Sequence, residues 1–279
     1  MNPTYQQLLD KKKKGIPISM VTAYDFPAAR IVCEAGVDVL LVGDSVGTNV
    51  LGYESEREVT MDDMVHHLKA VVRGAPDGYV MADIPYGGAS DEDRAFRNAR
   101  TLVDAGAHII KIEGWEDKKV IVESLAGRGI AVCGHIGYNP QYHGPKGRVF
   151  GREPEVARQL LRSARVLEQA GARMIIIEKV PEEIAKIVTE NASIPVIGIG
   201  SGRYCDGQVL VLHDIIGLAP RTFRHARQYA EVYSVITGAV QQFRKDVEEH
   251  RFPAVEHSSH VDPQVADTVY REQNDGGSQ

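Results

Sequence analysis

Cysteine is scarce in this sequence, and its few copies stand far apart. The 279 residues include only Cys33, Cys133 and Cys205, and none of them lies in a CxxC or CxxH spacing. A disulfide framework needs paired cysteines, and a structural zinc site needs closely spaced ones. The sequence therefore argues against both, and we expect three buried thiols.

The sequence also lacks an excess of positive charge and a long apolar run. Its formal net charge is −6, whereas nucleic-acid-binding domains usually carry a basic surface. No segment approaches the roughly 20 apolar residues that span a bilayer, and residues 1–10 lack the apolar core of a signal peptide. We therefore expect a cytoplasmic protein that binds neither nucleic acid nor membranes.

A GxGxxG motif between a strand and a helix is missing as well, which argues against a dinucleotide-binding domain. From Ile18 to Leu218, however, short apolar runs alternate with longer segments of helical periodicity, which is typical of repeated βα units. The expected strands are 18–24, 37–44, 78–84, 108–113, 130–136, 174–179, 194–200 and 209–213. The expected helices are 26–35, 60–74, 91–105, 116–127, 153–170, 181–191, 203–208 and 221–249.

Eight parallel strands in one chain of this length fit a closed (β/α)8 barrel better than an open, doubly wound sheet. No internal linker divides the chain. We therefore predict a single-domain TIM barrel over residues 1–260, with a long helical stretch near its end, and a flexible polar tail over residues 261–279.

One phrase recurs three times along the chain, over residues 35–44, 105–113 and 170–178. Each copy has an Ala-Gly pair, a few small or polar residues, an aliphatic run and a final carboxylate. This pattern indicates a helix that ends at glycine, a turn, and a buried strand. With the strand 79–83, which also ends on an acid, the strand-end carboxylates are those of Asp44, Asp83, Glu113 and Glu178.

These four acids point to a metal site. The carboxyl ends of all strands in a parallel barrel lie on one face, so the acids are expected to converge there. Packed together without a cation, they would repel one another. Oxygen ligands favour Mg²⁺, although another divalent cation is possible. A single strand-end acid can also simply cap the next helix. Asp25, at the end of the first expected strand, fits the acid set, but with Phe26-Pro27 after it the residue fits a helix start equally well.

Two further polar residues accompany the acids. Lys111 precedes Glu113 by two residues, so strand alternation points both side chains into the barrel, about 6.6 Å apart along the strand. Such a lysine can hold a substrate carboxylate or form a Schiff base, and the neighbouring acids favour the ion pair. His135 ends the fifth strand beside them, and we expect it to contact the substrate.

Several short segments, in order along the chain, match the pattern of one enzyme family. They are Thr22–Asp25, Val42–Ser45, Ala82–Pro85, Lys111–Gly114, Val132–His135, Ile194–Gly200, Asp206–Val211 and Glu256–Ser258. With these motifs, over about residues 5–260, the chain closely resembles the ketopantoate hydroxymethyltransferase (3-methyl-2-oxobutanoate hydroxymethyltransferase) family.

The resemblance implies a Mg²⁺-dependent enzyme of pantothenate synthesis. It would carry a hydroxymethyl group from 5,10-methylenetetrahydrofolate to 3-methyl-2-oxobutanoate, giving 2-dehydropantoate through a metal-stabilised enolate. The family also forms homo-oligomers, typically decamers. By resemblance, Asp44, Asp83 and Glu113 hold the metal, Ser45, Lys111 and His135 contact the oxo acid, and Glu178 is the general base.

The chain departs from the family pattern after the fifth strand. Residues 137–141 read Gly-Tyr-Asn-Pro-Gln where the family usually has Gly-Leu-Thr-Pro-Gln, and residues 143–152 replace a Gly-Gly-(Tyr/Phe)-Lys-Val-Gln-Gly-Arg stretch. Loops at this face cover or select substrates, so the departure leaves open whether the second substrate, the one-carbon donor, is the usual folate. Lys179, directly after the expected base, is also unusual, and alternation predicts that it turns away from the barrel centre.

Two other functions stay open from the sequence. Another Mg²⁺-dependent 2-oxo acid aldolase, lyase or mutase of the phosphoenolpyruvate-type barrels would use the same acids with a different electrophile. A non-catalytic barrel assembly protein would have lost the chemistry, but the retention of every expected ligand and of Glu178 argues against it. Folate-dependent turnover of the oxo acid would separate the transferase from both.

Overall fold

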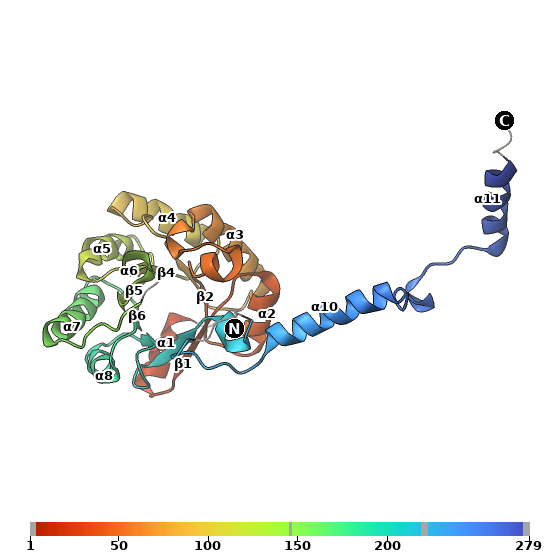
Figure 1. Cartoon of the computed structure of the whole chain (residues 1–279). Helices are drawn as coiled ribbons and strands as arrows, with labels where there is room; N and C mark the ends of the chain where they lie inside the picture. The colour runs from red at the N-terminus through yellow and green to blue at the C-terminus, as the bar shows by residue number, and fades with distance from the viewer. Residues whose placement is uncertain (1–3, 145–146, 219–222, 276–279) are drawn as a thin grey trace. The chain divides into compact units, whose positions relative to one another are not determined.

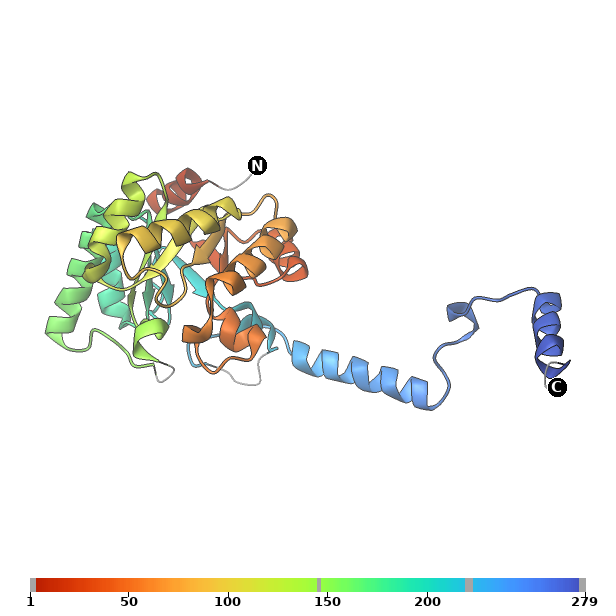
Figure 2. The ribbon, with the colours of Figure 1, turned by 90° about the horizontal axis from the view of Figure 1, so that it is seen from above.

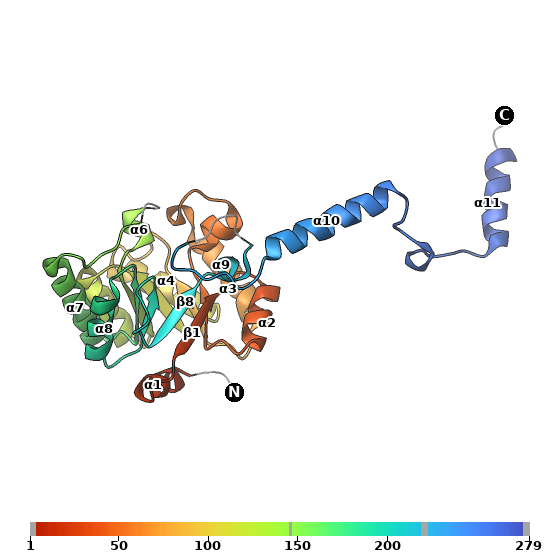
Figure 3. The same cartoon turned by 60° about the horizontal axis from the view of Figure 1, so that its bottom comes forward.

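The computed structural model describes residues 4–144, 147–218 and 223–275. Its eight barrel strands are parallel, each pairs with the next, and β8 closes the barrel by pairing with β1. Figure 3 shows β8 beside β1. The predicted (β/α)8 barrel is therefore confirmed. The strands are β1 (Ile18–Thr22), β2 (Val39–Val42), β3 (Val80–Asp83), β4 (Ile109–Glu113), β5 (Val132–Gly137), β6 (Met174–Glu178), β7 (Val196–Ile199) and β8 (Gly207–Leu210).

Helices surround the strands (Figures 1 and 2). They are α2 (Phe26–Glu34), α3 (Met61–Gly74), α4 (Glu92–Asp104), α5 (Lys119–Gly127), α7 (Pro154–Gln169) and α8 (Glu182–Asn191). Further helices are α1 (Tyr5–Lys13), α6 (Pro140–His143) and α9 (Leu212–Ile216), and single turns lie at Gly47–Leu51, Glu56–Glu58, Glu116–Lys118 and Val255–His257.

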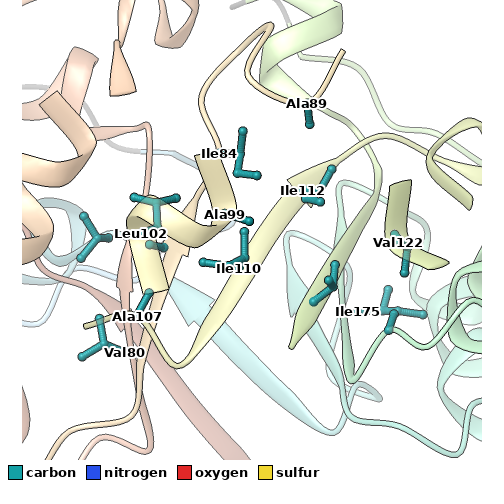
Figure 4. Packing of buried hydrophobic residues seen from close by; sticks show 14 of the residues in the cluster. Val80, Ile84, Ala89, Ala99, Leu102, Ala107, Ile110, Ile112, Val122 and Ile175 are labelled. Atoms are coloured by element: carbon teal, nitrogen blue, oxygen red, sulfur yellow. The ribbon is translucent and has the colours of Figure 1, made fainter. Parts of the chain in front are cut away.

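One apolar layer lies between the strands and the helices. Figure 4 shows part of it, where Ile110 of β4 lies near Ala99 and Leu102 of α4. These three side chains are fully buried, and burial of an Ile or Leu side chain contributes roughly 1.5–3 kcal/mol. This layer helps to position the strand ends, because it packs against the outer faces of β1 to β7.

A second apolar layer fills the barrel interior. Its members occupy alternate positions on the strands and are joined by Leu8 of α1, which contacts β1 (Figure 3). The interior is therefore a packed core in its lower part, with no room for a ligand there. The buried residues of this layer are Leu8, Ile18, Met20, Val39, Leu41, Tyr79, Met81, Ile109, Ala131, Cys133, Met174, Ile176, Ile197 and Val209.

The recurring Ala-Gly phrase does what its pattern predicts. Gly36, Gly106 and Gly171 follow the last residues of α2, α4 and α7 and have φ angles of 77°, 110° and 100°. An L side chain rarely adopts such angles, so glycine ends these helices and lets the chain turn back into the next strand. Asp25 is a helix cap, because its Oδ1 accepts a hydrogen bond from the N–H of Ala28 at 2.8 Å.

Two expected elements near the end of the barrel are wrong. Residues 203–206 are irregular rather than helical, and β8 begins at Gly207 instead of residue 209. A Cβ at Gly207 would collide with the carbonyl oxygen of Ile18, so this glycine permits close strand packing and does not mark a turn. Within the expected helix 221–249, residues 223–231 are not helical, and residues 221–222 lie outside the described residues.

The chain divides after Ala230 into a barrel unit and a C-terminal unit that begins at Glu231, before the expected boundary after residue 260. The second unit contains α10 (Val232–Glu248) and α11 (Pro263–Asp275). The expected polar tail thus contains a helix, and residues 276–279 lie outside the described part of the chain. No helix among the described residues is long and apolar enough to cross a membrane.

Candidate active site

Charged side chains line the upper end of the barrel interior. Asp83 ends β3, Lys111 and Glu113 lie on β4, His135 lies on β5, and Glu178 ends β6. They continue the alternation of the apolar residues below them, so the strands direct them into the barrel. The first four are buried. The structure thus brings together strand-end residues that lie far apart in the sequence.

Asp44 reaches the same cluster by a different route. The sequence predicts that Asp44 ends the second strand, but β2 ends at Val42. Asp44 therefore lies in the turn that follows the strand. Its N–H donates to Asp83 Oδ2 at 3.1 Å. A Cβ on the preceding Gly43 would lie 2.9 Å from Ser45 Oγ, so this glycine leaves space for the Ser45 hydroxyl.

Lys111 is the cation at the centre of the acids. Its Nζ lies 2.8 Å from Asp83 Oδ2 and 3.5 Å from Glu113 Oε1. Burial by itself would lower the pKa of the Lys111 ammonium, but Asp83 and Glu113 outweigh burial and raise it. An ammonium that stays charged is a poor nucleophile, so the structure favours the ion-pairing role over a Schiff base.

Glu113 and His135 form a second pair, with Glu113 Oε1 3.2 Å from His135 Nδ1. Burial would raise the pKa of Glu113, but Lys111 and His135 overcome it and lower that pKa to about 2. Burial would likewise lower the pKa of His135, but Glu113 overcomes it and raises that pKa to about 9. Both groups are therefore charged at neutral pH.

Asp44 has the opposite electrostatic situation. Burial raises its pKa well above the ordinary aspartate value, and the carboxylates of Asp83 and Glu113 raise it further. Lys111 and a hydrogen bond from Gln141 act in the other direction and do not compensate. The three acids Asp44, Asp83 and Glu113 thus outnumber the two cations Lys111 and His135.

Glu178 lies beside His135 at the edge of the cluster. Its Oε2 is 3.4 Å from His135 Nε2, an ionic contact in which Nε2 has no hydrogen-bond partner among the described residues. The side chain of Glu178 is 13% exposed, so solvent or a ligand reaches it. The prediction that Lys179 turns away from the barrel centre is wrong, because its Nζ lies 3.9 Å from Glu178 Oε1. Both oxygens of Glu178 therefore face a cationic nitrogen.

Gln141 is a site residue that the motif analysis does not single out. It lies on α6, where its N–H donates to Glu113 Oε2 at 3.0 Å and its Nε2 donates to Asp44 Oδ2 at 2.7 Å. Arg57 holds α6 in place by donating from Nε to the Gln141 carbonyl at 2.6 Å. The available signal is the Pro140-Gln141 pair, which agrees with the family pattern although its flanking residues differ.

A pocket of about 210 Å³ opens above this cluster. Ser45 lies on its wall, and its Oγ is 2.8 Å from the hydroxyl of Tyr24. The lining includes all seven residues expected from the sequence, so they share one cavity. These are Asp44, Ser45, Asp83, Lys111, Glu113, His135 and Glu178.

The acids suit a hard cation, although the described residues contain no group of three His, Cys, Asp or Glu side chains arranged to hold a metal. Lys111 lies between Asp83 and Glu113. However, Asp83 Oδ1 is buried and lacks a hydrogen-bond partner within the described ranges. Carboxylate oxygens bind Mg²⁺, and a cation there would satisfy this oxygen and reduce the repulsion on Asp44. The donor set therefore fits a divalent cation.

Comparison with known proteins assigns the family. A model of the family described as ketopantoate hydroxymethyltransferase matches residues 2–255. The chain belongs to the ketopantoate hydroxymethyltransferase family. It is 51% identical over 253 residues to the 3-methyl-2-oxobutanoate hydroxymethyltransferase of Thermotoga sp. (strain RQ2), covering 89% of this chain and 94% of that protein. It is 46% identical to the protein of the same name from Ignicoccus hospitalis, over 90% of this chain and 96% of that protein.

Solved structures with a similar fold have other activities. A phosphonopyruvate hydrolase in complex with oxalate and Mg²⁺ is 12% identical, with a TM-score of 0.62 over 99% of this chain and 98% of that one. A 2,3-dimethylmalate lyase is 16% identical, with a TM-score of 0.56 over 99% of this chain and 100% of that one. At this identity the likeness shows the barrel fold alone. Membership of the ketopantoate hydroxymethyltransferase family, an enzyme family, therefore decides between the alternatives left open by the sequence.

Proposed function

We propose that this enzyme transfers a hydroxymethyl group from 5,10-methylenetetrahydrofolate to 3-methyl-2-oxobutanoate and forms 2-dehydropantoate, a step of pantothenate biosynthesis in the cytoplasm. The observation that carries the proposal is the position of Glu178. It is a partly exposed carboxylate at the edge of a pocket that contains an acid cluster and a central lysine. Such a pocket combines a base with groups that bind an anionic 2-oxo acid.

We infer that Asp44, Asp83 and Glu113 hold a divalent cation, with Mg²⁺ as the preferred ion. Asp44 and Asp83 are the more direct candidates, because Glu113 is already engaged by Lys111, His135 and Gln141. A bound divalent cation would supply Lewis-acid polarisation of the keto group next to the carbon that loses its proton.

Ser45, Lys111 and His135 are the proposed contacts to the oxo acid. The Lys111 ammonium is a charged donor at the floor of the pocket and suits the substrate carboxylate. His135 is charged at neutral pH because of Glu113, and its Nε2 lies in ionic contact with Glu178 but makes no hydrogen bond among the described residues, so this N–H can donate to a substrate oxygen. The Ser45 hydroxyl is oriented by Tyr24 and offers a neutral hydrogen bond at the pocket wall.

Glu178 is the proposed general base that removes the proton from C3 of the oxo acid. It lies outside the group of candidate ligands and borders the pocket, where the pocket walls exclude part of the solvent. A base positioned in this way contributes about 10²–10⁴-fold to a proton transfer. The carbon that loses the proton then forms a C–C bond with the methylene carbon of the folate, whose two C–N bonds break. Water supplies the hydroxyl oxygen of the product, and tetrahydrofolate leaves.

Deuterium exchange at C3 tests this proposal. In D2O with Mg²⁺ and tetrahydrofolate, the enzyme should exchange the C3 hydrogen, and with methylenetetrahydrofolate it should form 2-dehydropantoate. Glu178→Gln should abolish exchange and leave Mg²⁺ binding intact, whereas Asp44→Ala should weaken Mg²⁺ binding in a calorimetric titration. Exchange at the wild-type rate in Glu178→Gln would refute the assigned base, and an unchanged titration would refute Asp44 as a ligand.

We also infer a homo-oligomer, with a decamer as the expected state. Helix α10 buries none of its side chains within its own unit. Its apolar residues recur every three or four positions and are 45–60% exposed, which leaves an apolar stripe open to a partner. The stripe consists of Tyr233, Ile236, Val240, Phe243 and Val247. Light scattering coupled to size-exclusion chromatography measures the subunit number, and a monomer at micromolar concentration would contradict the inference.

A further inference from the structure

Lys179 has a backbone conformation that is unusual for a lysine. Its φ is 49°, in the left-handed region that residues other than glycine seldom adopt. Two hydrogen bonds hold it there, because its N–H donates to the carbonyl of Ile199 at 2.9 Å and its own carbonyl accepts from the N–H of Phe150 at 2.8 Å. Since the residue follows β6 directly, this turn interrupts the strand alternation that would point its side chain outward.

The turn places the Lys179 ammonium against the proposed base. Its Nζ lies 3.9 Å from Glu178 Oε1, and the other oxygen of Glu178 lies 3.4 Å from His135 Nε2. The Lys179 side chain is only 23% exposed, so the ion pair is partly shielded from water. With Lys179 Nζ near one oxygen and His135 Nε2 near the other, the carboxylate of Glu178 has a nitrogen on each side.

The loop that departs from the family pattern holds the other side of Lys179. Its Nζ lies 4.0 Å from the centre of the Tyr138 ring, which is a cation–π distance. Burial and then the charge of Glu178 raise the pKa of Tyr138 to about 12, so the ring is a neutral phenol. A Cβ on Gly147 would collide with Lys179 Nζ, so this glycine leaves the space that the ammonium occupies.

Other titratable groups around the pair are few. His225 lines the same pocket and lies next to Gly200, where it feels the charges of both Glu178 and Lys179. Burial lowers the pKa of His225, so it is neutral at pH 7 and does not replace the ammonium. Lys179 and His135 are therefore the nitrogen-bearing side chains within 4 Å of the Glu178 carboxylate among the described residues.

We propose that Lys179 is a positioning residue for Glu178. Its ammonium lies against Oε1 while His135 lies against Oε2, so the carboxylate faces the pocket in one orientation. Tyr138 holds the ammonium in the space that Gly147 leaves. Through Lys179 the divergent loop is linked to the base. This inference rests on the proposed function, because it takes Glu178 as the group that removes the proton.

Steady-state exchange of the C3 hydrogen of 3-methyl-2-oxobutanoate tests the role directly. The assay contains Mg²⁺ and saturating tetrahydrofolate but no one-carbon unit, so it reports proton removal alone. Lys179→Met should lower the exchange kcat roughly tenfold and leave KM for the oxo acid within about twofold, because it removes an interaction of the base and not of the ligand. Lys179→Arg should restore most of kcat, since a guanidinium also pairs with a carboxylate and stacks on Tyr138.

Two further variants separate this role from a structural one. Lys179→Gly removes the ammonium at a φ that glycine adopts freely, so it should fold and still exchange slowly. Lys186→Met removes an exposed lysine of α8 that pairs with Glu190, and it should exchange at the wild-type rate.

The outcomes of this experiment are distinct. A wild-type kcat in Lys179→Met would overturn the proposal. A defect confined to KM for tetrahydrofolate would also overturn it and would indicate that Lys179 contacts the folate. Failure of Lys179→Arg to recover more activity than Lys179→Met would also count against it. Absence of exchange in the wild-type enzyme would instead overturn the proposed function itself, and with it this inference.

Discussion

The two ends of the barrel interior are built from the same strands but follow opposite principles. On β4, Ile109 lies in the apolar lower layer, and Lys111 lies two residues further along in the charged upper layer. The lower layer needs no specific partners, because packed apolar side chains are stable in many arrangements. In the upper layer each buried charge depends on its neighbours, because a lone buried charge is costly. The lower layer therefore tolerates substitution, whereas the upper layer, which carries the chemistry, depends on specific partners.

The largest effect should follow from removing the central cation of the upper layer. Lys111→Met leaves Asp83 and Glu113 buried without their partner and should reduce the free energy of unfolding by about 3–5 kcal/mol. Urea unfolding followed by circular dichroism measures the change. Lys119→Met on α5 is the control, because its pair with Glu123 is exposed and should matter little. An equally small loss in both variants would show that the acids do not depend on Lys111.

The pH dependence of stability should be dominated by the same layer. The pKa of Glu113 is about 2 in the folded protein and 4.5 in its unperturbed state, so its ionisation stabilises the fold by up to roughly 3 kcal/mol. This contribution is complete above about pH 4.5 and is lost as the pH falls toward 2.

His135 should make the free energy of unfolding fall at alkaline pH. Its pKa of about 9 exceeds the ordinary 6.5, so its contribution is complete below pH 6.5 and is lost as the pH rises through 9. Urea titrations between pH 2.5 and 10 measure the loss of stability at both acidic and alkaline pH. Glu113→Gln should reduce both losses, because it also removes the partner of His135. A steep loss of stability at acidic pH that remains in this variant would assign the acid sensitivity to other groups.

A cavity in the lower layer should cost stability without changing the chemistry. Ile109→Ala is expected to reduce the free energy of unfolding by about 2 kcal/mol, near the lower limit for such changes, because the neighbouring Met81 can fill part of the space. The exchange kcat of the folded enzyme should stay unchanged. Ile109→Val is the matched control, with an expected loss of about 1 kcal/mol. A large fall in kcat for Ile109→Ala would mean that the two layers are not independent.

The smallest effect should arise outside both layers. Thr60 caps α3. Its Oγ1 accepts a hydrogen bond from the N–H of Asp63 at 3.2 Å, and its own N–H donates to Asp63 Oδ2 at 2.9 Å. Thr60→Ala should cost about 1 kcal/mol, whereas Thr60→Ser should retain the cap. Thermal unfolding measures both variants. Altered exchange kinetics in Thr60→Ala would show that the helical shell influences the site.

The course of the fold was largely readable from local patterns. The Ala-Gly phrase predicts where α2, α4 and α7 end, because a positive φ at the following glycine is a local requirement. The region from 203 to 210 was misread, because Gly207 is needed for close contact with β1, a strand almost 190 residues away in the sequence. Close packing between distant segments leaves no local pattern.

The candidate site shows the same limit. Alternation predicts that Lys111 and Glu113 point the same way, and their atoms do lie 3.5 Å apart. It fails for Lys179, because a left-handed turn held by Ile199 and Phe150 overrides it. Gln141 was missed because its contacts to Asp44 and Glu113 join residues 97 and 28 positions apart.

By itself, the sequence determined the eight-stranded barrel and the acids at its strand ends, because period, turn glycines and alternation are properties of neighbouring residues. Only the tertiary structure decided which groups pair with which. It placed Lys111 between two acids, brought Gln141 over them and gave Glu178 a cation at each oxygen. These contacts depend on closure of the barrel, which brings distant strand ends within a few ångströms and makes each charge depend on the others.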